Sequence, residues 1–79
     1  MHLDKNFVEE LELLNLFNLE SSQEGLKIHH QAEPARIDSA KRLFEKNLIT
    51  LVDGGYLTPL GIQAVEHAQA LVRILQPRG

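Results

Sequence analysis

The 79-residue sequence lacks cysteine altogether, and tryptophan is absent as well. Without cysteine the chain forms no disulfide and no thiolate metal site. A domain of this length buries only about 60–65% of the surface that its unfolded chain exposes, so its hydrophobic core is thin. Small domains without such cross-links are often stabilised by oligomerisation. We therefore expect a single domain over residues 1–79, with residues 76–79 as a flexible tail, and we expect it to form a homodimer.

Long apolar runs and catalytic motifs are also missing. No uninterrupted apolar segment approaches the roughly 20 residues that span a bilayer, and the N-terminus has no basic region followed by an apolar run. We therefore expect a cytoplasmic chain without membrane contact. The sequence contains no glycine-rich phosphate loop, no G-x-S-x-G motif and no H-E-x-x-H motif. It predicts no catalytic residue and no cofactor site, so the chain is not expected to be an enzyme.

The chain is acidic overall, with a formal net charge of −3. Residues 1–26 hold six acidic residues against one lysine, whereas residues 27–46 hold five basic residues against three acidic ones. A negative net charge argues against a surface that attracts DNA everywhere. The basic excess makes residues 27–46 the segment best suited to contact phosphates. The alternative is that these side chains form an ordinary solvated helix face.

Residues 4–18 have the apolar spacing of a first helix, with Asp4 as a suitable N-cap. The residues at i, i+3, i+4 and i+7 spacing form one buried stripe: Phe7, Val8, Leu11, Leu14 and Phe17. Leu13 and Leu16 widen this apolar surface, so the helix is either deeply buried or shared with a partner. The acidic residues between Glu9 and Glu12 are interpreted as a solvated face.

Residues 19–33 fit two structures. Ser21 with Glu24 three residues later fits a capping box, which favours a helical turn from Ser22. The alternation from Leu26 to His30 instead favours a short strand, which would pair beside the hairpin described below. We expect one helical turn followed by an extended segment, although residues 22–30 also fit either structure alone.

The adjacent histidines His29 and His30 invite a metal hypothesis, because imidazole is a common metal ligand. Neighbouring side chains point to opposite faces of a strand, or lie about 100° apart on a helix. No cysteine, histidine or acidic partner stands at a ligand-like spacing. The sequence therefore predicts no metal site.

Residues 34–46 predict a helix that begins at Pro34. Its core side is expected to carry Ile37, Ala40, either Leu43 or Phe44, and Leu48. Winding the helix at about 100° per residue places three residues together on the outward face and two at its flanks. These are Ser39, Arg42 and Lys46, flanked by Arg36 and Lys41. The i, i+4 pairs Asp38–Arg42 and Lys41–Glu45 are expected to neutralise part of this positive charge.

The Asp53–Gly55 stretch between two β-prone runs predicts a tight hairpin. A two-residue loop would set Leu57 opposite Thr50, whereas a three-residue loop sets it opposite Leu51 with Ile49 on the same face. We expect the three-residue loop, because it buries all three aliphatic side chains together. The hairpin tip is acidic and carries no basic residue, so we expect it to contribute stability and not phosphate contacts.

Residues 59–75 predict the last helix, with Thr58 as its cap and Pro59 at its first position. The expected core-facing residues are Leu60, Ala64, Ala68, Leu71, Val72 and Leu75. Ile62, Val65 and Ile74 extend the apolar surface too far around the axis for one thin core. We therefore expect the homodimer to form largely through this helix, the alternative being a single helix that closes a monomer.

Two stretches, Leu48–Thr50 and Gly55–Gly61, resemble the passage of winged-helix DNA-binding domains that runs from the recognition helix through the wing to the last helix. Most of the chain also resembles a family of small uncharacterised proteobacterial proteins that carry a DNA-binding label. The resemblance implies a mainly α fold with a small β-hairpin wing, winged-helix-like with three or four helices, in which residues 34–46 form the recognition helix.

The same resemblance implies that the chain binds double-stranded DNA in transcriptional regulation. On the recognition helix we expect the outward-facing and flanking residues to contact DNA, namely Arg36, Ser39, Lys41, Arg42 and Lys46, with Lys27 as an auxiliary phosphate contact. The alternative is a protein-interaction module that keeps the winged-helix scaffold without binding DNA, because a fold does not determine a function.

Overall fold

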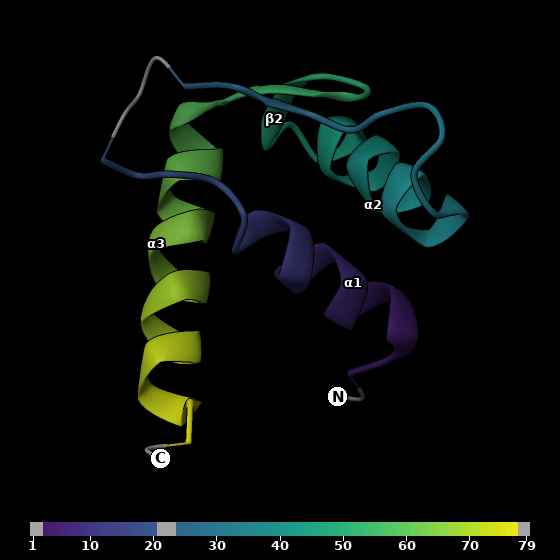
Figure 1. The fold of residues 1–79 in the computed structure, drawn as a ribbon. Coiled ribbons are helices and arrows are strands. Elements are labelled where there is room, and N and C mark those ends of the chain that lie inside the picture. Colours follow the sequence, from purple (N-terminus) through teal and green to yellow (C-terminus); the bar gives the residue numbers. More distant parts are fainter. Residues whose placement is uncertain (1–2, 21–23, 78–79) are drawn as a thin grey trace.

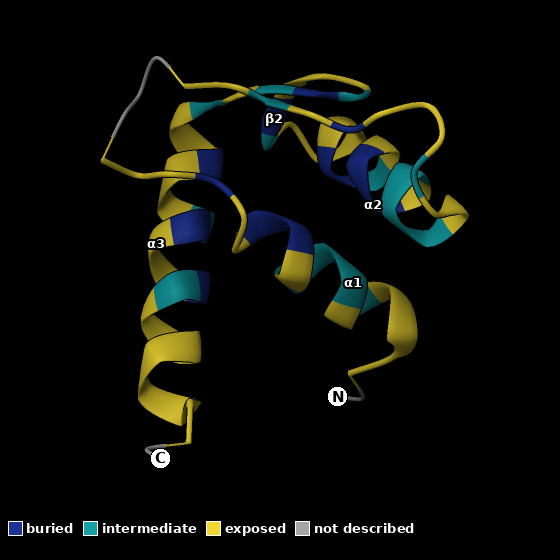
Figure 2. Ribbon diagram, viewed as in Figure 1, coloured by how far each residue is buried: buried dark blue, intermediate teal, exposed yellow. Residues whose placement is uncertain are grey.

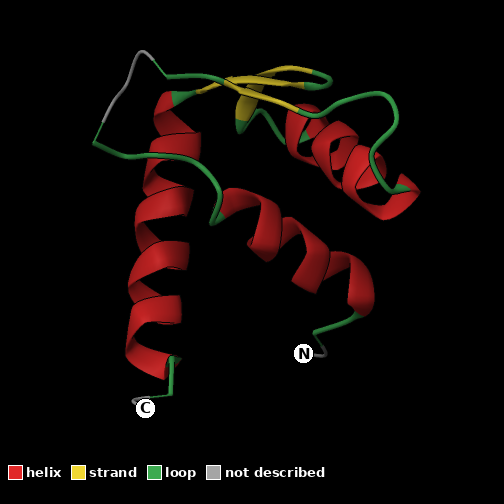
Figure 3. Ribbon diagram, viewed as in Figure 1, coloured by secondary structure: helices red, strands yellow, loops and turns green. Residues whose placement is uncertain are grey.

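Three helices and three short strands make up the part of the chain that the computed structural model describes, residues 3–20 and 24–77 (Figure 3). In chain order they are α1 (Lys5–Leu14), β1 (Leu26–Lys27), α2 (Pro34–Glu45), β2 (Ile49–Leu51), β3 (Gly54–Leu57) and α3 (Pro59–Leu75). The strands form one antiparallel sheet in the order β1-β3-β2. In Figure 1 the sheet lies across one end of the molecule, and α1 packs against both α2 and α3. The predicted fold class, mainly helical with a small β wing and winged-helix-like, is confirmed with three helices.

The core lies where the helices meet the sheet (Figure 2). Leu13 of α1, Leu43 of α2, Ile49 of β2 and Val65 of α3 are each at most 2% exposed. The other buried apolar residues are Leu14, Phe17, Ile28, Ala40 and Ala68. Leu13 was expected only to widen the stripe of the first helix and is instead one of its most buried residues. All three helices and β2 contribute to this one core. The shared packing therefore fixes where α2 lies relative to the hairpin.

α1 begins where the sequence predicts but ends earlier. Asp4 caps it, because Oδ1 accepts a hydrogen bond of 2.8 Å from the amide three residues on. The predicted end at residue 18 is wrong, since the helix ends at Leu14. The carbonyls of Asn15 and Phe17 accept hydrogen bonds from the side chain of Gln69 on α3, at 3.3 and 2.6 Å. This distant partner satisfies carbonyl groups at the end of α1 and holds the buried Phe17 against the core.

The segment that the sequence left open contains a strand. Leu26 and Lys27 pair with the first two residues of β3. The Ile28 amide continues the pairing by donating to the Asp53 carbonyl at 2.7 Å. The expected extended segment is therefore confirmed, while the expected helical turn from Ser22 lies outside the described residues.

α2 begins at Pro34 as predicted and ends in a left-handed turn at Asn47, whose φ is 64°. The amides of Asn47 and Leu48 donate to the carbonyls of Phe44 and Leu43, both at 3.0 Å. This Schellman arrangement satisfies carbonyls at the helix end, and asparagine tolerates the left-handed conformation better than most residues. It turns the chain directly from α2 into β2.

The hairpin forms, but its predicted register is wrong. Val52 and Asp53 make the turn, and the next two residues belong to β3. Ile49 lies opposite Leu57, and the register shifts between Ile49 and Leu51. As a result Leu51 is 54% exposed and not buried with the other two aliphatic residues.

The register follows from the position of β3 as the central strand. Gly54 and Gly55 have φ values of 129° and 80°, in the region that favours glycine. A Cβ atom on Gly54 would lie 2.1 Å from the carbonyl oxygen of Leu26. Glycine is therefore needed where β1 pairs with β3. Because these glycines belong to the strand, the turn is formed by the two residues before them, Val52 and Asp53.

α3 spans Pro59–Leu75, the bounds that the sequence predicts. The hydroxyl of Thr58 accepts a hydrogen bond from the Gly61 amide at 2.9 Å and donates one to the Asn47 carbonyl at 2.7 Å. One side chain thus caps α3 and joins it to the end of α2.

The predicted core face of α3 is confirmed at Ala64 and Ala68 and wrong at the other expected positions. Val65 is fully buried, whereas four expected core residues are exposed: Leu60, Leu71, Val72 and Leu75. The rotation of the helix is set at Gly61, where a Cβ atom would lie 2.0 Å from the carbonyl oxygen of Leu48. Since the glycine must face the connection between α2 and β2, the residues one and two turns later on the same side, Val65 and Ala68, become buried.

Candidate interaction surface on α2 and the hairpin

The structure separates the six predicted DNA-contact residues into groups on different sides of α2. Arg42, Ser39 and Lys46 lie on the side that faces α1. Lys27 and Lys41 border a groove on the hairpin side, and Arg36 borders a hollow beside β1. These residues therefore do not form one continuous basic surface.

The predicted outward position of Ser39 is wrong. Its side chain is fully buried, and its hydroxyl donates to the Ala35 carbonyl at 2.8 Å. The same oxygen accepts a hydrogen bond of 3.0 Å from Nη2 of Arg42. Ser39 therefore helps to hold the Arg42 guanidinium along α2 and does not face solvent.

Glu10 of α1 forms ion pairs with two of the basic side chains that were predicted to contact DNA. Nε of Arg42 donates to Oε2 of Glu10 at 3.0 Å, and Nζ of Lys46 forms an ion pair with Oε1. The Glu10 side chain is 12% exposed and that of Arg42 26%, so the expected outward position of Arg42 is also wrong. Nη2 of Arg42 further donates to the Asn6 carbonyl at 3.3 Å. The single carboxylate of Glu10 thus neutralises one of these two positive charges across the interface with α1, and the Lys46 side chain stays 56% exposed.

Sequence reasoning missed Glu10 because it lies among acidic residues that were interpreted as a solvated face. The spacing between Glu10 and the buried leucines of the same helix could have revealed its position. Glu10 stands three and four residues before the buried Leu13 and Leu14, so it shares their side of the helix. A carboxylate on a core-facing stripe requires a cationic partner.

The side of α2 that faces solvent is not basic. Asp38, Lys41 and Glu45 are exposed there, which gives two carboxylates against one ammonium group. Among the residues that the structure describes, the ion pairs within 4.0 Å are those of Glu10 with Arg42 and with the lysine one turn later. The expected ion pairs within α2 therefore do not form.

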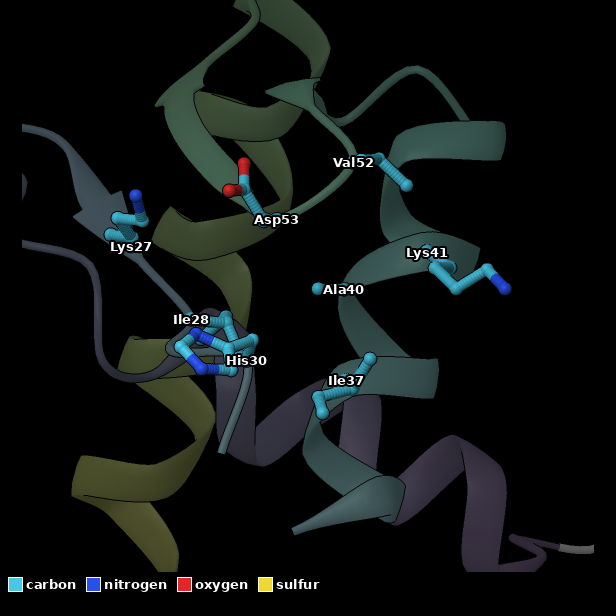
Figure 4. A pocket seen from close by; sticks show the side chains of 8 residues that line it. All are labelled: Lys27, Ile28, His30, Ile37, Ala40, Lys41, Val52 and Asp53. Carbon is cyan, nitrogen blue, oxygen red and sulfur yellow. The ribbon is translucent and has the colours of Figure 1, made fainter. Parts of the chain in front are cut away.

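A groove of about 400 Å³ separates α2 from the hairpin turn and the end of β1 (Figure 4). Its apolar residues include Ile28 and Ala40, both buried, and the half-buried Ile37. Val52 at the hairpin turn adds an apolar side chain that is 49% exposed. The groove therefore has apolar walls that are open to solvent on one side.

The polar residues of the groove are mainly basic. Lys27 and Lys41 are exposed on its opposite walls, and His30 and Asp53 complete the polar lining. In Figure 4 the side chain of Lys41 extends from α2 away from Asp53. The ammonium groups of both lysines lie beyond 4.0 Å of any carboxylate among the described residues. They are therefore available to an acidic ligand.

The hairpin carries further exposed apolar side chains besides Val52, which lines the groove. Leu51, Val52 and Tyr56 are each about half exposed. Leu51 and Tyr56 border an adjoining hollow together with Asp53. Phe44 on α2 is also exposed. Apolar side chains gathered on a surface are typical of protein contacts, whereas a wing that enters a DNA groove carries basic residues.

The two adjacent histidines pack on each other. The ring centroids of His29 and His30 lie 4.4 Å apart, and Nδ1 of His29 accepts a hydrogen bond of 3.2 Å from the Gln31 amide. Within residues 3–20 and 24–77, no group of three or more histidine, aspartate or glutamate side chains is placed to hold a metal ion.

The order of helices and strands, with a hairpin between α2 and α3, defines a small winged-helix-like domain. By sequence the chain belongs to a family of unknown function, DUF5669, which it matches over residues 1–76. No curated protein and no solved structure matches it. In the described ranges, none of the helices is long and apolar enough to cross a membrane.

Proposed function

We propose that this chain is a protein-interaction module on a winged-helix-like scaffold, and that it binds a segment of a partner protein in the groove between α2 and the hairpin. The observation that carries the proposal is the engagement of Arg42 and Lys46 by Glu10. This contact holds the Arg42 guanidinium against α1 and away from the solvent face of α2, where Asp38 and Glu45 outnumber Lys41. The neighbouring groove is apolar and open.

The groove selects a partner by its chemistry. A volume of about 400 Å³ lies toward the small end of ligand pockets, and suits one or two apolar side chains rather than a whole helix. Lys27 and Lys41 on opposite walls favour acidic residues on either side of that apolar anchor. The partner is therefore a short segment with an apolar side chain flanked by aspartate or glutamate.

The test is site-specific photo-crosslinking in the cytoplasm, the compartment in which we propose that the chain acts. A photoreactive amino acid replaces Val52, which lines the groove, or Glu66, which is exposed on α3 and serves as the matched control. We expect one protein adduct at position 52 that is absent at position 66 and is lost when Ile37→Asp is added. The captured protein, once purified, must bind the wild-type chain directly. Adducts that are equal at both positions, or that survive Ile37→Asp, would refute the proposal.

Binding of duplex DNA is the second candidate function, because the winged-helix-like element order and the exposed Lys27 and Lys41 favour it. In that case Glu10 competes with phosphates for Arg42 and Lys46. Glu10→Gln should then raise affinity for a labelled duplex of about 20 base pairs, and raising the salt from about 50 to about 200 mM should weaken binding steeply. The double variant Arg42→Ala/Lys46→Ala should bind less tightly, with a shallower dependence on salt. No salt-dependent binding by either the wild type or Glu10→Gln would eliminate this candidate.

A further inference from the structure

The part of α3 beyond Gln69 extends past the rest of the described structure. Gln69 donates side-chain hydrogen bonds from α3 to the Phe17 and Asn15 carbonyls in the turn after α1, at 2.6 and 3.3 Å. Every residue from 70 to 77 is exposed, and the C-terminal end of α3 is accordingly yellow in Figure 2. The final turns contain Leu71, Val72, Ile74 and Leu75, and Ile74 is 77% exposed. A short helix end without tertiary contacts is marginal in water, and an apolar one is poorly solvated as well.

These residues belong to a longer pattern along α3. Its exposed and half-buried positions at alternating spacings of four and three are Leu60, Ala64, His67, Leu71 and Ile74. This is the heptad spacing by which two helices pack side by side. We call these five residues the α3 seam. It lies beside the buried core face of Gly61, Val65 and Ala68. Ala64 also packs against the core, whereas the other four residues of the seam are exposed.

We propose that the α3 seam is the interface through which two copies of this chain form an antiparallel, two-fold symmetric dimer. In that arrangement Ala64 of one protomer lies opposite Ile74 of the other, and His67 lies opposite Leu71, while Leu60 lies beyond the end of the partner's α3. Each small or polar residue thus faces a large apolar one, which is the self-complementarity that a two-fold interface requires. Antiparallel pairing also brings opposite ends of the two helix dipoles together.

The small area of the α3 seam leads us to expect a weak dimer. In this register residues 63–75 of the two α3 helices overlap, a stretch about 20 Å long and, with its side chains, about 10 Å across. One such face lies at the small end of specific interfaces, below the roughly 800 Å² that each partner commonly buries. The dimer therefore dissociates in the micromolar range. Its surface is separate from the groove proposed for the partner protein, so either proposal can fail without the other.

The experiment is sedimentation equilibrium of the wild type and three variants from about 5 to about 200 μM, the range in which a small interface dissociates. Ile74→Glu places a charge in the α3 seam and should weaken the dimer by more than about tenfold. Ile62→Glu is the matched control, since Ile62 is an exposed isoleucine on the same helix outside the seam, and it should leave the dimer unchanged. His67→Leu should strengthen dimerisation, because leucine is favoured at such positions.

Far-UV circular dichroism checks that Ile74→Glu stays folded, which its high exposure in the wild type leads us to expect. A wild type that remains monomeric at the highest concentration would overturn the proposal. A folded Ile74→Glu variant that dimerises like the wild type would also overturn it, as would an equal loss of dimer in Ile62→Glu.

Discussion

Gly61 is the position at which one added methyl group should be most informative about the fold. In a helix, replacing glycine with alanine normally increases stability by about 1 kcal/mol. At Gly61, however, the added Cβ atom would lie 2.0 Å from the carbonyl oxygen of Leu48. That oxygen also accepts a hydrogen bond of 3.1 Å from the Thr58 amide, so it cannot move without disturbing the start of α3.

The expected size of the effect follows from these opposing terms. Overpacking a well-fitted site costs about 1–3 kcal/mol, and a clash with backbone lies toward the upper end. Subtracting the gain in helix propensity leaves a net loss of about 2 kcal/mol for Gly61→Ala. A domain of this length has a free energy of unfolding of about 4–12 kcal/mol. The substitution should therefore remove between about a sixth and about a half of the stability.

Urea denaturation followed by far-UV circular dichroism measures this loss, at a protein concentration low enough to keep the chain monomeric. Ala70→Gly is the control, because Ala70 is exposed on the same helix. It should report the helix-propensity difference alone, about 1 kcal/mol of destabilisation. If Gly61→Ala is as stable as the wild type or more stable, then α3 does not approach the chain between α2 and β2 as closely as described, and the reasoning fails.

Gly54→Val should destabilise the fold by at least about 2 kcal/mol, because a β-branched residue is strained at a φ of 129° and its Cβ would lie 2.1 Å from the Leu26 carbonyl. A thermal melt that matches the wild type would contradict the glycine requirement in the central strand. Thr58→Ala should lower the free energy of unfolding by about 1–2 kcal/mol, since it removes both the cap of α3 and the hydrogen bond to the Asn47 carbonyl. Thr58→Ser keeps the hydroxyl and should retain most of that stability in the same urea titration. Glu10→Gln should lower the free energy of unfolding by about 1 kcal/mol, less at high salt, because it weakens the ion pairs to α2. A loss that does not depend on salt would mean that packing, and not charge, holds this side chain.

The sequence was most informative where structure is set by neighbours along the chain. Asp4, Pro34 and Thr58 were recognised as helix starts, and each stands at the start of a helix in the structure. Two of them act through hydrogen bonds to an amide three residues ahead. Such contacts depend on a few consecutive residues, so their residue types suffice to predict them.

The sequence was least informative about which way a helix faces. The apolar surface of α3 is too broad to select one side, and the choice depends on a close approach between Gly61 and Leu48. The end of α1 likewise depends on Gln69, more than 50 residues away. Helix periodicity restricts which residues share a face, but it does not state what that face will meet.

For the candidate interaction surface, too, some features could be predicted from the sequence and others depended on tertiary packing. The sequence by itself determined that the basic excess falls on residues 27–46 and that a hairpin follows this segment. Only the tertiary structure decided that Arg42 and Lys46 meet Glu10, and that Lys27 and Lys41 border a groove. The physical reason is the distance along the chain between the residues that make each contact. Capping and turn formation are contacts between near neighbours in the chain, whereas an ion pair between α1 and α2 or a strand register around Gly54 exists only after distant segments have packed.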